Sequence, residues 1–213
     1  MYICFYFSKY HQLITVYVKI TIGDYPKIQN SIYYKGANEL LQRPLASEYP
    51  EYYKPYVSLV PEGDLLILLK NNLVKTIELF ESLTEENGQF RYAENKWSIK
   101  EVLGHMADTE RIMSYRLLRV GRGDPTALAG FNENDYVNGS QIYKLPIKNI
   151  LEDFIATRKA TLTLFQNMPE EAWTSIGFAN NTEVTARAIG YIIAGHALHH
   201  FNIIRDRYLP FLK

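Results

Sequence analysis

Four segments of the chain place apolar residues at steps of three and four, the spacing that gives a helix one apolar face. The first predicted helix carries Leu65, Leu66, Leu69, Leu73, Ile77 and Phe80 on that face. The four predicted spans are Asp64 to Leu83, Ser98 to about Val120, roughly Ile147 to Asn167, and Thr185 to Tyr208. A capping box marks the second start, because Glu101 follows Ser98 by three residues. Pro169 to Trp173 predicts one further helical turn.

These helices indicate an all-α protein, an antiparallel up-and-down four-helix bundle over residues 41–213. No alternation of strands and helices suggests a parallel sheet. The middle pair of helices is joined by a long connection that contains Gly130 to Tyr136. Loops of about twenty residues inside a compact domain are often functional or partly ordered by a ligand.

Residues 1–40 are expected to be a separate N-terminal extension, extended or strand-like. Up to residue 38 the only acid is Asp24, and Leu13 to Ile22 is dense in β-branched residues. The segment is either a strand packed on the domain or an extension that arises from an upstream start codon. We favour the extension, because a lone strand has no evident partner for its backbone. Residues 39–61 contain four prolines and predict an extended, tyrosine-bearing lead-in.

The composition of the chain mainly excludes classes of protein. The chain of 213 residues is 47% apolar, enough to bury a core without disulfides, so a disordered chain is excluded. The 23 basic and 23 acidic residues cancel, which argues against nucleic-acid binding. The sequence predicts neither a membrane span nor a signal peptide. A single cysteine, Cys4, permits no internal disulfide, and we expect a cytoplasmic protein.

Candidate chemistry comes from the histidines. His196 and His200 lie four residues apart on the fourth predicted helix, so their rings share a face and can reach one cation at about 2.0–2.1 Å. The pair alone leaves a second interpretation open, in which both are buried neutral histidines bonded to the backbone. A pairing of His196 with His199 is less favourable, and His11 in the extension is expected to face solvent.

His105 on the second predicted helix favours the metal interpretation. It shares a face with Val102, Thr109 and Ile112. A bundle brings the second and fourth helices together and can close a three-histidine site, and three nitrogens with an open position are typical of a catalytic metal. Ala197 stands where an HExxH motif needs glutamate, which excludes a metalloprotease of that kind.

The segment KWSIKEVLGH at residues 96–105, with the distant HxxxH at 196–200, resembles the DinB/YfiT-like superfamily. The resemblance covers about residues 45–210. It rests on the Trp-Ser-x-x-Glu cap, the histidine seven residues after the serine, and the HxxxH. It implies an up-and-down four-helix bundle with a divalent metal on three histidines, here His105, His196 and His200. The metal would be Zn, Ni, Fe or Mn.

Members of that superfamily include transferases and isomerases that use bacillithiol or mycothiol, and YfiT-like proteins regarded as metal-dependent hydrolases. Our first hypothesis is a thiol S-transferase, because no carboxylate stands beside the HxxxH to act as a base. The thiol would come from outside the domain, since Cys4 lies in the extension. A hydrolase with a metal-bound hydroxide and a non-enzymatic, metal-binding stress-related bundle are the alternatives.

The remaining candidates carry simpler interpretations. Asp108 and Glu110 could accept from an imidazole, but an ordinary helix-surface ladder with Arg111 is favoured. Trp97 is expected to pack in the core. The polar and aromatic loop residues could line a pocket mouth or form a solvated loop: Asn132, Glu133, Asp135 and Tyr136. We expect a small-molecule substrate, no nucleic acid and no membrane, and a possible homodimer, which tyrosine-rich residues 49–56 could contact.

Overall fold

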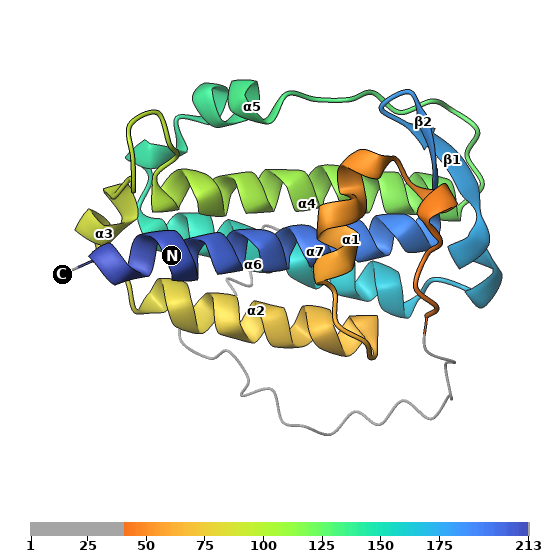
Figure 1. Cartoon of the computed structure of the whole chain (residues 1–213), viewed down its shortest axis with the longest axis horizontal. Helices are drawn as coiled ribbons and strands as arrows, with labels where there is room; N and C mark the ends of the chain where they lie inside the picture. The colour runs from red at the N-terminus through yellow and green to blue at the C-terminus, as the bar shows by residue number, and fades with distance from the viewer. Residues whose placement is uncertain (1–40, 213) are drawn as a thin grey trace, which may run out of the picture. The chain divides into compact units, whose positions relative to one another are not determined.

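A computed structural model describes residues 41–212 of the protein. The predictions for residues 1–40, including Cys4 and His11, lie outside this range. The four predicted helices are confirmed: α2 (Leu65–Glu81), α4 (Ile99–Gly121), α6 (Ile147–Gln166) and α7 (Ala186–Ile203), as Figure 1 shows. No described helix combines the length and apolar character needed to cross a bilayer.

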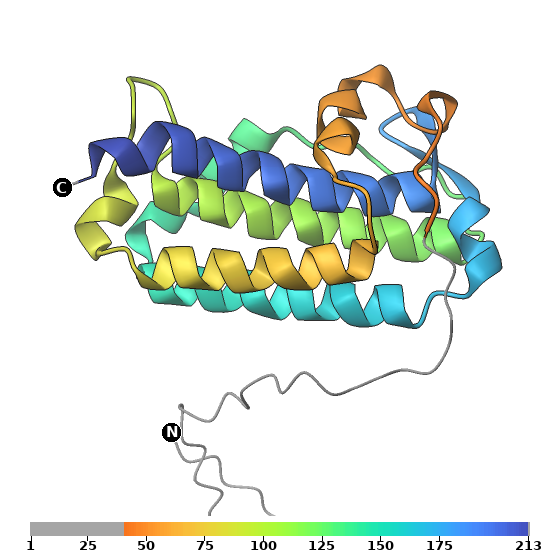
Figure 2. The ribbon, with the colours of Figure 1, turned by 60° about the horizontal axis from the view of Figure 1, so that its bottom comes forward.

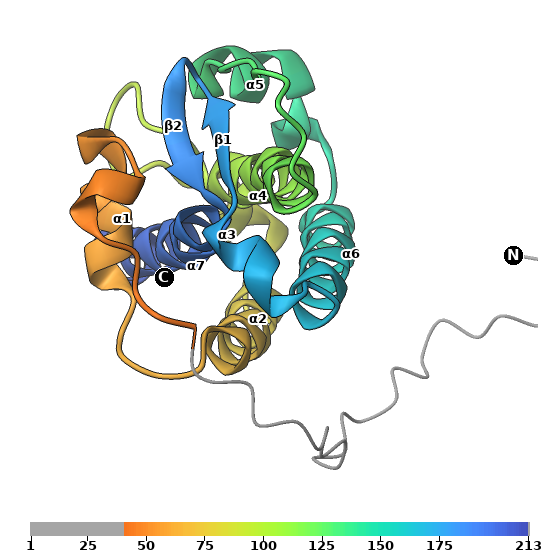
Figure 3. The same ribbon diagram turned by 90° about the vertical axis from the view of Figure 1, so that its right-hand side faces the viewer.

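The four long helices form the predicted bundle. Both α4 and α2 pack against α6 and α7, so the order around the bundle is α2, α6, α4, α7, seen end-on in Figure 3. The connectivity differs from the predicted up-and-down order in one respect. The long connection after α4 returns along the bundle, so α4 and α6 run parallel, whereas α4 and α7 run antiparallel (Figures 1 and 2). This order places the two histidine-bearing helices side by side.

Each long helix begins where a polar group satisfies its first free amides. The Ser98 side chain accepts from the amide of Glu101, whose carboxylate accepts from the amide of Ser98. Asp64 and Thr185 cap α2 and α7. At α6 the N-cap is Pro146, and the amide of Ile147 donates instead to the carboxylate of Glu85 at 2.9 Å. The predicted apolar faces are buried in one core.

The extended lead-in was predicted wrongly. Residues 41–60 contain two 3₁₀ turns, Ala46–Glu48 and Glu51–Tyr53, followed by α1 (Lys54–Leu59), which packs across α7. Pro55 sits in the first turn of α1, where a helix tolerates proline because that amide has no partner in any case. The contact needs a glycine, because a Cβ on Gly195 would lie 2.0 Å from the Tyr56 carbonyl oxygen.

The long middle connection is partly helical. Asn132 caps α5 (Glu133–Ser140), and a 3₁₀ turn follows at Ile142–Lys144. A hairpin, β1 (Ile176–Ala179) and β2 (Thr182–Thr185), leads into α7, and its two-residue turn has positive φ at Asn180 and Asn181, as a type I′ turn requires. Short α3 (Glu85–Gln89) lies in the polar break after α2. The predicted turn near Trp173 is the 3₁₀ segment Glu170–Thr174. The chain ends in a π-turn, Ile204–Tyr208, and a 3₁₀ turn, Leu209–Phe211.

Glu110 does not lie in a surface ladder. It is buried and pairs with Arg158 of α6 through two bonds, Nε to Oε1 at 2.5 Å and Nη2 to Oε2 at 2.6 Å. The same guanidinium donates to Asn72 Oδ1 at 3.0 Å and to the Leu69 carbonyl at 3.1 Å, both on α2. This pair joins three helices in the interior, whereas Asp108 is 3.6 Å from Arg111 as predicted.

Candidate metal centre

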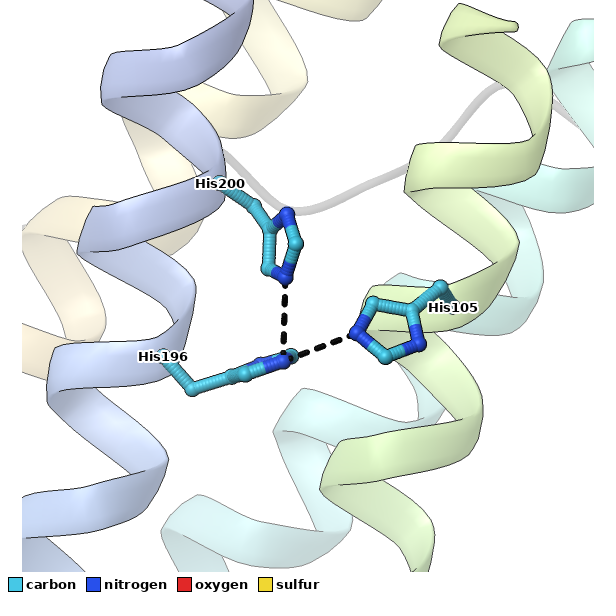
Figure 4. A group of neighbouring side chains, drawn as sticks. All are labelled: His105, His196 and His200. Carbon is cyan, nitrogen blue, oxygen red and sulfur yellow. Dashed lines mark hydrogen bonds between the residues drawn. The ribbon is translucent and has the colours of Figure 1, made fainter. Parts of the chain in front are cut away.

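Three imidazoles converge between α4 and α7 (Figure 4). The Nε2 atom of His196 lies 3.0 Å from Nε2 of His105 and 3.1 Å from Nε2 of His200. All three rings are buried, and one nitrogen from each lies within 4.8 Å of the others. Two nitrogens that share a tetrahedral zinc ion are about 3.3 Å apart, so the spacing suits one divalent cation.

The surrounding helices fix these rings. His105 lies in the second turn of α4, and the Trp97 ring just before the cap is 4.7 Å from its imidazole. Tyr56 of α1 packs 5.6 Å from the ring of His196. Trp97 is half-buried and packs against the core as predicted, and it also lines the cavity beside the histidines.

Burial keeps the three imidazoles neutral. Desolvation lowers the pKa of His105 to about 4. The pKa values of His196 and His200 fall well below the usual range, first through burial and then through the neighbouring imidazoles. A neutral imidazole has a lone pair, which is the form that binds a metal. The cluster is thus in its ligand form at neutral pH.

The outward nitrogens are unevenly satisfied. Nδ1 of His105 lies 3.4 Å from the hydroxyl of Thr109, a long contact that would suit an Nδ1–H donor. Nδ1 of His200 is the one buried side-chain nitrogen or oxygen among the described residues that has no hydrogen-bond partner. Buried polar atoms without partners are uncommon, and they cluster where function outweighs stability. The donor set and its spacing fit a divalent cation.

The histidines form one side of a cavity of about 420 Å³. A cavity of this volume admits a small molecule and leaves space beside the three nitrogens for a further ligand. The residues that line it come from the lead-in, α4, the long connection, the hairpin turn and α7: Tyr52, Tyr53, Tyr56, Trp97, His105, Thr109, Met113, Arg116, Gly130, Phe131, Glu133, Asn180, Ile192, His196 and His200.

Of the loop candidates, only Glu133 lines this cavity. Asn132 caps α5, and Asp135 and Tyr136 are exposed. His199 lies outside the cluster, with its ring 5.2 Å from Tyr56 in an edge-on contact. Sequence reasoning missed the buried Arg116. Its place on the histidine face could have been predicted. Arg116 follows His105 by eleven residues, which is three helical turns plus only about 20°, so the two side chains share one face of α4.

A family model described as the DinB superfamily matches residues 68–204, which span α2 to α7. The chain belongs to the DinB superfamily. The match includes all three clustered histidines and all four long helices except the first three residues of α2. The comparison with curated proteins finds no match.

Solved structures with this DinB bundle include YfiT from Bacillus subtilis, described as a probable metal-dependent hydrolase with an unusual four-helix bundle topology. It matches with a TM-score of 0.62 at 14% identity, over 78% of this chain and 90% of YfiT. The mycothiol-dependent maleylpyruvate isomerase matches with a TM-score of 0.56 at 12% identity, over 71% of this chain and 66% of that protein. At these identities the likeness shows the fold.

Proposed function

We propose that the protein is a divalent-metal-dependent enzyme that transfers a low-molecular-weight thiol to an electrophilic small molecule. His105, His196 and His200 would bind the metal. The observation that carries this proposal is the convergence of three neutral imidazole nitrogens on the wall of a cavity large enough for a small molecule. The family and the description of one neighbour as mycothiol-dependent support it.

A divalent cation at this site would favour the thiolate form of a thiol, which is the nucleophile in such a transfer. The transfer forms a carbon–sulfur bond, breaks the bond from that carbon to its leaving group, and releases the thiol proton to solvent. No oxidant is needed. The chain supplies the rest: the aromatic side chains of Tyr56, Trp97 and Phe131 line the cavity and reduce access of water to the reacting atoms.

A metal-dependent hydrolase is the second candidate, supported by the description of YfiT. This activity usually needs a carboxylate base, and Glu133 is the one acid among the described residues that line the cavity. Burial raises the pKa of the Tyr53 and Tyr56 hydroxyls, and the negative charge of Glu133 adds a smaller increase to each. Glu133 makes no contact with the three histidines. Its place beside the tyrosines favours the thiol transferase.

The test uses zinc-loaded protein with glutathione or cysteine and 1-chloro-2,4-dinitrobenzene, whose conjugation is followed by absorbance. The proposal predicts a thiol-dependent rate that His200→Ala removes and Glu133→Gln leaves within about threefold. Ester hydrolysis without thiol, lost in Glu133→Gln, would support the hydrolase instead. Elemental analysis of the purified protein for Zn, Ni, Fe and Mn comes first, because metal binding without either activity would favour the non-enzymatic alternative.

A further inference from the structure

Arg116 is a buried cation inside the same cavity as the histidines. It lies on α4 three turns after His105, and only 2% of its surface is exposed. Side chains on a helix lean toward its N-terminus. In agreement, a guanidinium nitrogen of Arg116 contacts Met113 Sδ at 3.3 Å, one turn nearer to the histidines.

The partners of this guanidinium are all uncharged. Arg116 Nη2 donates to the Ala129 carbonyl at 2.6 Å, a side-chain hydrogen bond joins the guanidinium to the Tyr53 hydroxyl, and the group lies over the Phe131 ring at 5.9 Å. Among the described residues no carboxylate forms an ion pair with it. An arginine has five N–H donors, and a buried charge without a counter-ion is costly.

The other buried arginine of the bundle shows what a satisfied site looks like. Arg158 has a bidentate carboxylate and two further acceptors, and it does not line the cavity. Arg116 has only uncharged partners: a carbonyl, a tyrosine hydroxyl, a sulfur and an aromatic face. Glu133 lines the same cavity but does not pair with it. Arg116 therefore lacks the anionic partner that a buried guanidinium needs.

We propose that Arg116 binds a carboxylate of the ligand whose other end reaches the histidine cluster. The proposal rests on the proposed function, and it adds that one of the two substrates is a carboxylic acid. From Met113 to His105 α4 rises by about 12 Å, so the acid group and the reacting atom would be about 10 Å apart. Guanidinium and carboxylate match in shape, which makes the contact selective.

The carboxylate could belong to the thiol or to the acceptor, and paired probes separate the two. Calorimetric titration of zinc-loaded protein compares glutathione with its diethyl ester, and 4-methylbenzoate with its methyl ester. The wild-type protein is expected to bind the acid about tenfold or more tightly than the ester in one pair, as a charged hydrogen-bonded contact implies. A preference within the glutathione pair assigns the carboxylate to the thiol. A preference within the benzoate pair assigns it to the acceptor.

Arg116→Met should bring that ratio close to one, and Arg116→Lys should keep part of it. Arg122→Met removes a charge from an exposed position at the end of the same helix and should leave the ratio unchanged. Circular dichroism checks folding, and Arg116→Gln replaces the methionine variant if that does not fold. Equal binding of acid and ester by the wild type, or a preference that persists without Arg116, would overturn the proposal.

The benzoates contain no thiol and calorimetry needs no turnover, so the two proposals fail separately. The benzoate titrations are repeated on metal-free protein, where a preference that depends on Arg116 would stand even if thiol transfer were absent. Conversely, a thiol-dependent rate with no acid preference would leave the transferase intact and remove only the role of Arg116.

Discussion

The bundle interior contains two polar clusters that begin only five residues apart on α4. The Glu110–Arg158 pair is closed: the carboxylate and the guanidinium are bonded to each other, and two acceptors on α2 take two of the other three donors. The histidine cluster is open: three lone-pair nitrogens face one another, one imidazole nitrogen has no partner, and the cluster lines a cavity. A buried polar group that is fully paired fixes the packing, whereas one left incomplete is available to a ligand.

The two clusters should therefore respond differently to substitution. Breaking the closed cluster removes a partner from a buried charge and should cost stability. Breaking the open cluster should cost ligand binding and leave the fold intact. Substitutions in the two clusters test this contrast directly, and two further substitutions test how the lead-in is held against α7; they follow from the largest expected effect to the smallest.

Arg158→Met should lower the free energy of unfolding by about 3–5 kcal/mol, because it leaves the Glu110 carboxylate buried without a counter-ion. Urea unfolding monitored by circular dichroism measures the change. The double variant Glu110→Leu with Arg158→Met should recover most of the loss, since no buried charge remains. His105→Ala in metal-free protein should cost about 1 kcal/mol or less, because its site opens into an existing cavity. Equal losses for Arg158→Met and His105→Ala would remove the contrast.

His200→Ala should weaken zinc binding more than about 100-fold, because even the outer partners of a metal ligand contribute 10–100-fold. Competition with a chromogenic chelator measures the affinity. His199→Ala is the matched control: it removes the adjacent imidazole, which lies outside the cluster, and should change the affinity less than about threefold. The same loss in both variants would show that the motif was assigned to the wrong histidine.

Gly195→Ala should destabilise the protein by about 1–3 kcal/mol, because the new Cβ would overlap the Tyr56 carbonyl at 2.0 Å and push α1 from α7. Since α1 supplies Tyr56 to the cavity wall and to the ring of His196, small-molecule binding should weaken and zinc affinity should also fall. Thermal unfolding measures the first effect and calorimetry the second. Gly139→Ala, which meets no atom within 4 Å, should be neutral.

The smallest expected effect is at Glu48, which attaches the lead-in to α7. Burial raises the pKa of its carboxyl, but hydrogen bonds from Arg187, the Leu45 amide and Thr185 outweigh that and hold the pKa below 4.5. A carboxyl with a lowered folded-state pKa stabilises the protein above its unfolded pKa and loses this effect as pH falls through the folded value. Glu48→Gln should cost about 1 kcal/mol at pH 7 and less at pH 3. Urea unfolding of both proteins at pH 7 and pH 3 measures the loss of stability. An equal loss at the two pH values would contradict this prediction.

Much of the fold and site could be predicted from local patterns. The apolar period predicted the four helices because each buries one face, and the HxxxH with His105 predicted the cluster because helical spacing fixes which side chains share a face. Contacts between distant segments could not be predicted in this way. Glu110 and Arg111 look like an ordinary charged ladder, and only the fold brings Arg158 to Glu110 across 48 residues. One signal was present: Arg158 interrupts the apolar face of α6 between Phe154 and Leu162.

The short elements were missed for another reason. The hairpin strands have four residues each and α1 has six, too few to show a period. Pro55 reads as a helix breaker when its place in the first turn is unknown. These same segments contribute Tyr56 and Asn180 to the cavity. The histidine cluster was therefore more predictable than the cavity beside it.

X-ray absorption at the zinc edge of the zinc-loaded full chain tests the central claim most directly. We expect one zinc per chain, with three imidazole nitrogens at about 2.0–2.1 Å and a fourth ligand that is an oxygen or nitrogen atom. When glutathione is added, sulfur should replace this fourth ligand. In His105→Ala the imidazole count should fall to two and the stoichiometry should drop. Sub-stoichiometric zinc in the wild type, or an unchanged ligand shell in His105→Ala, would contradict the account.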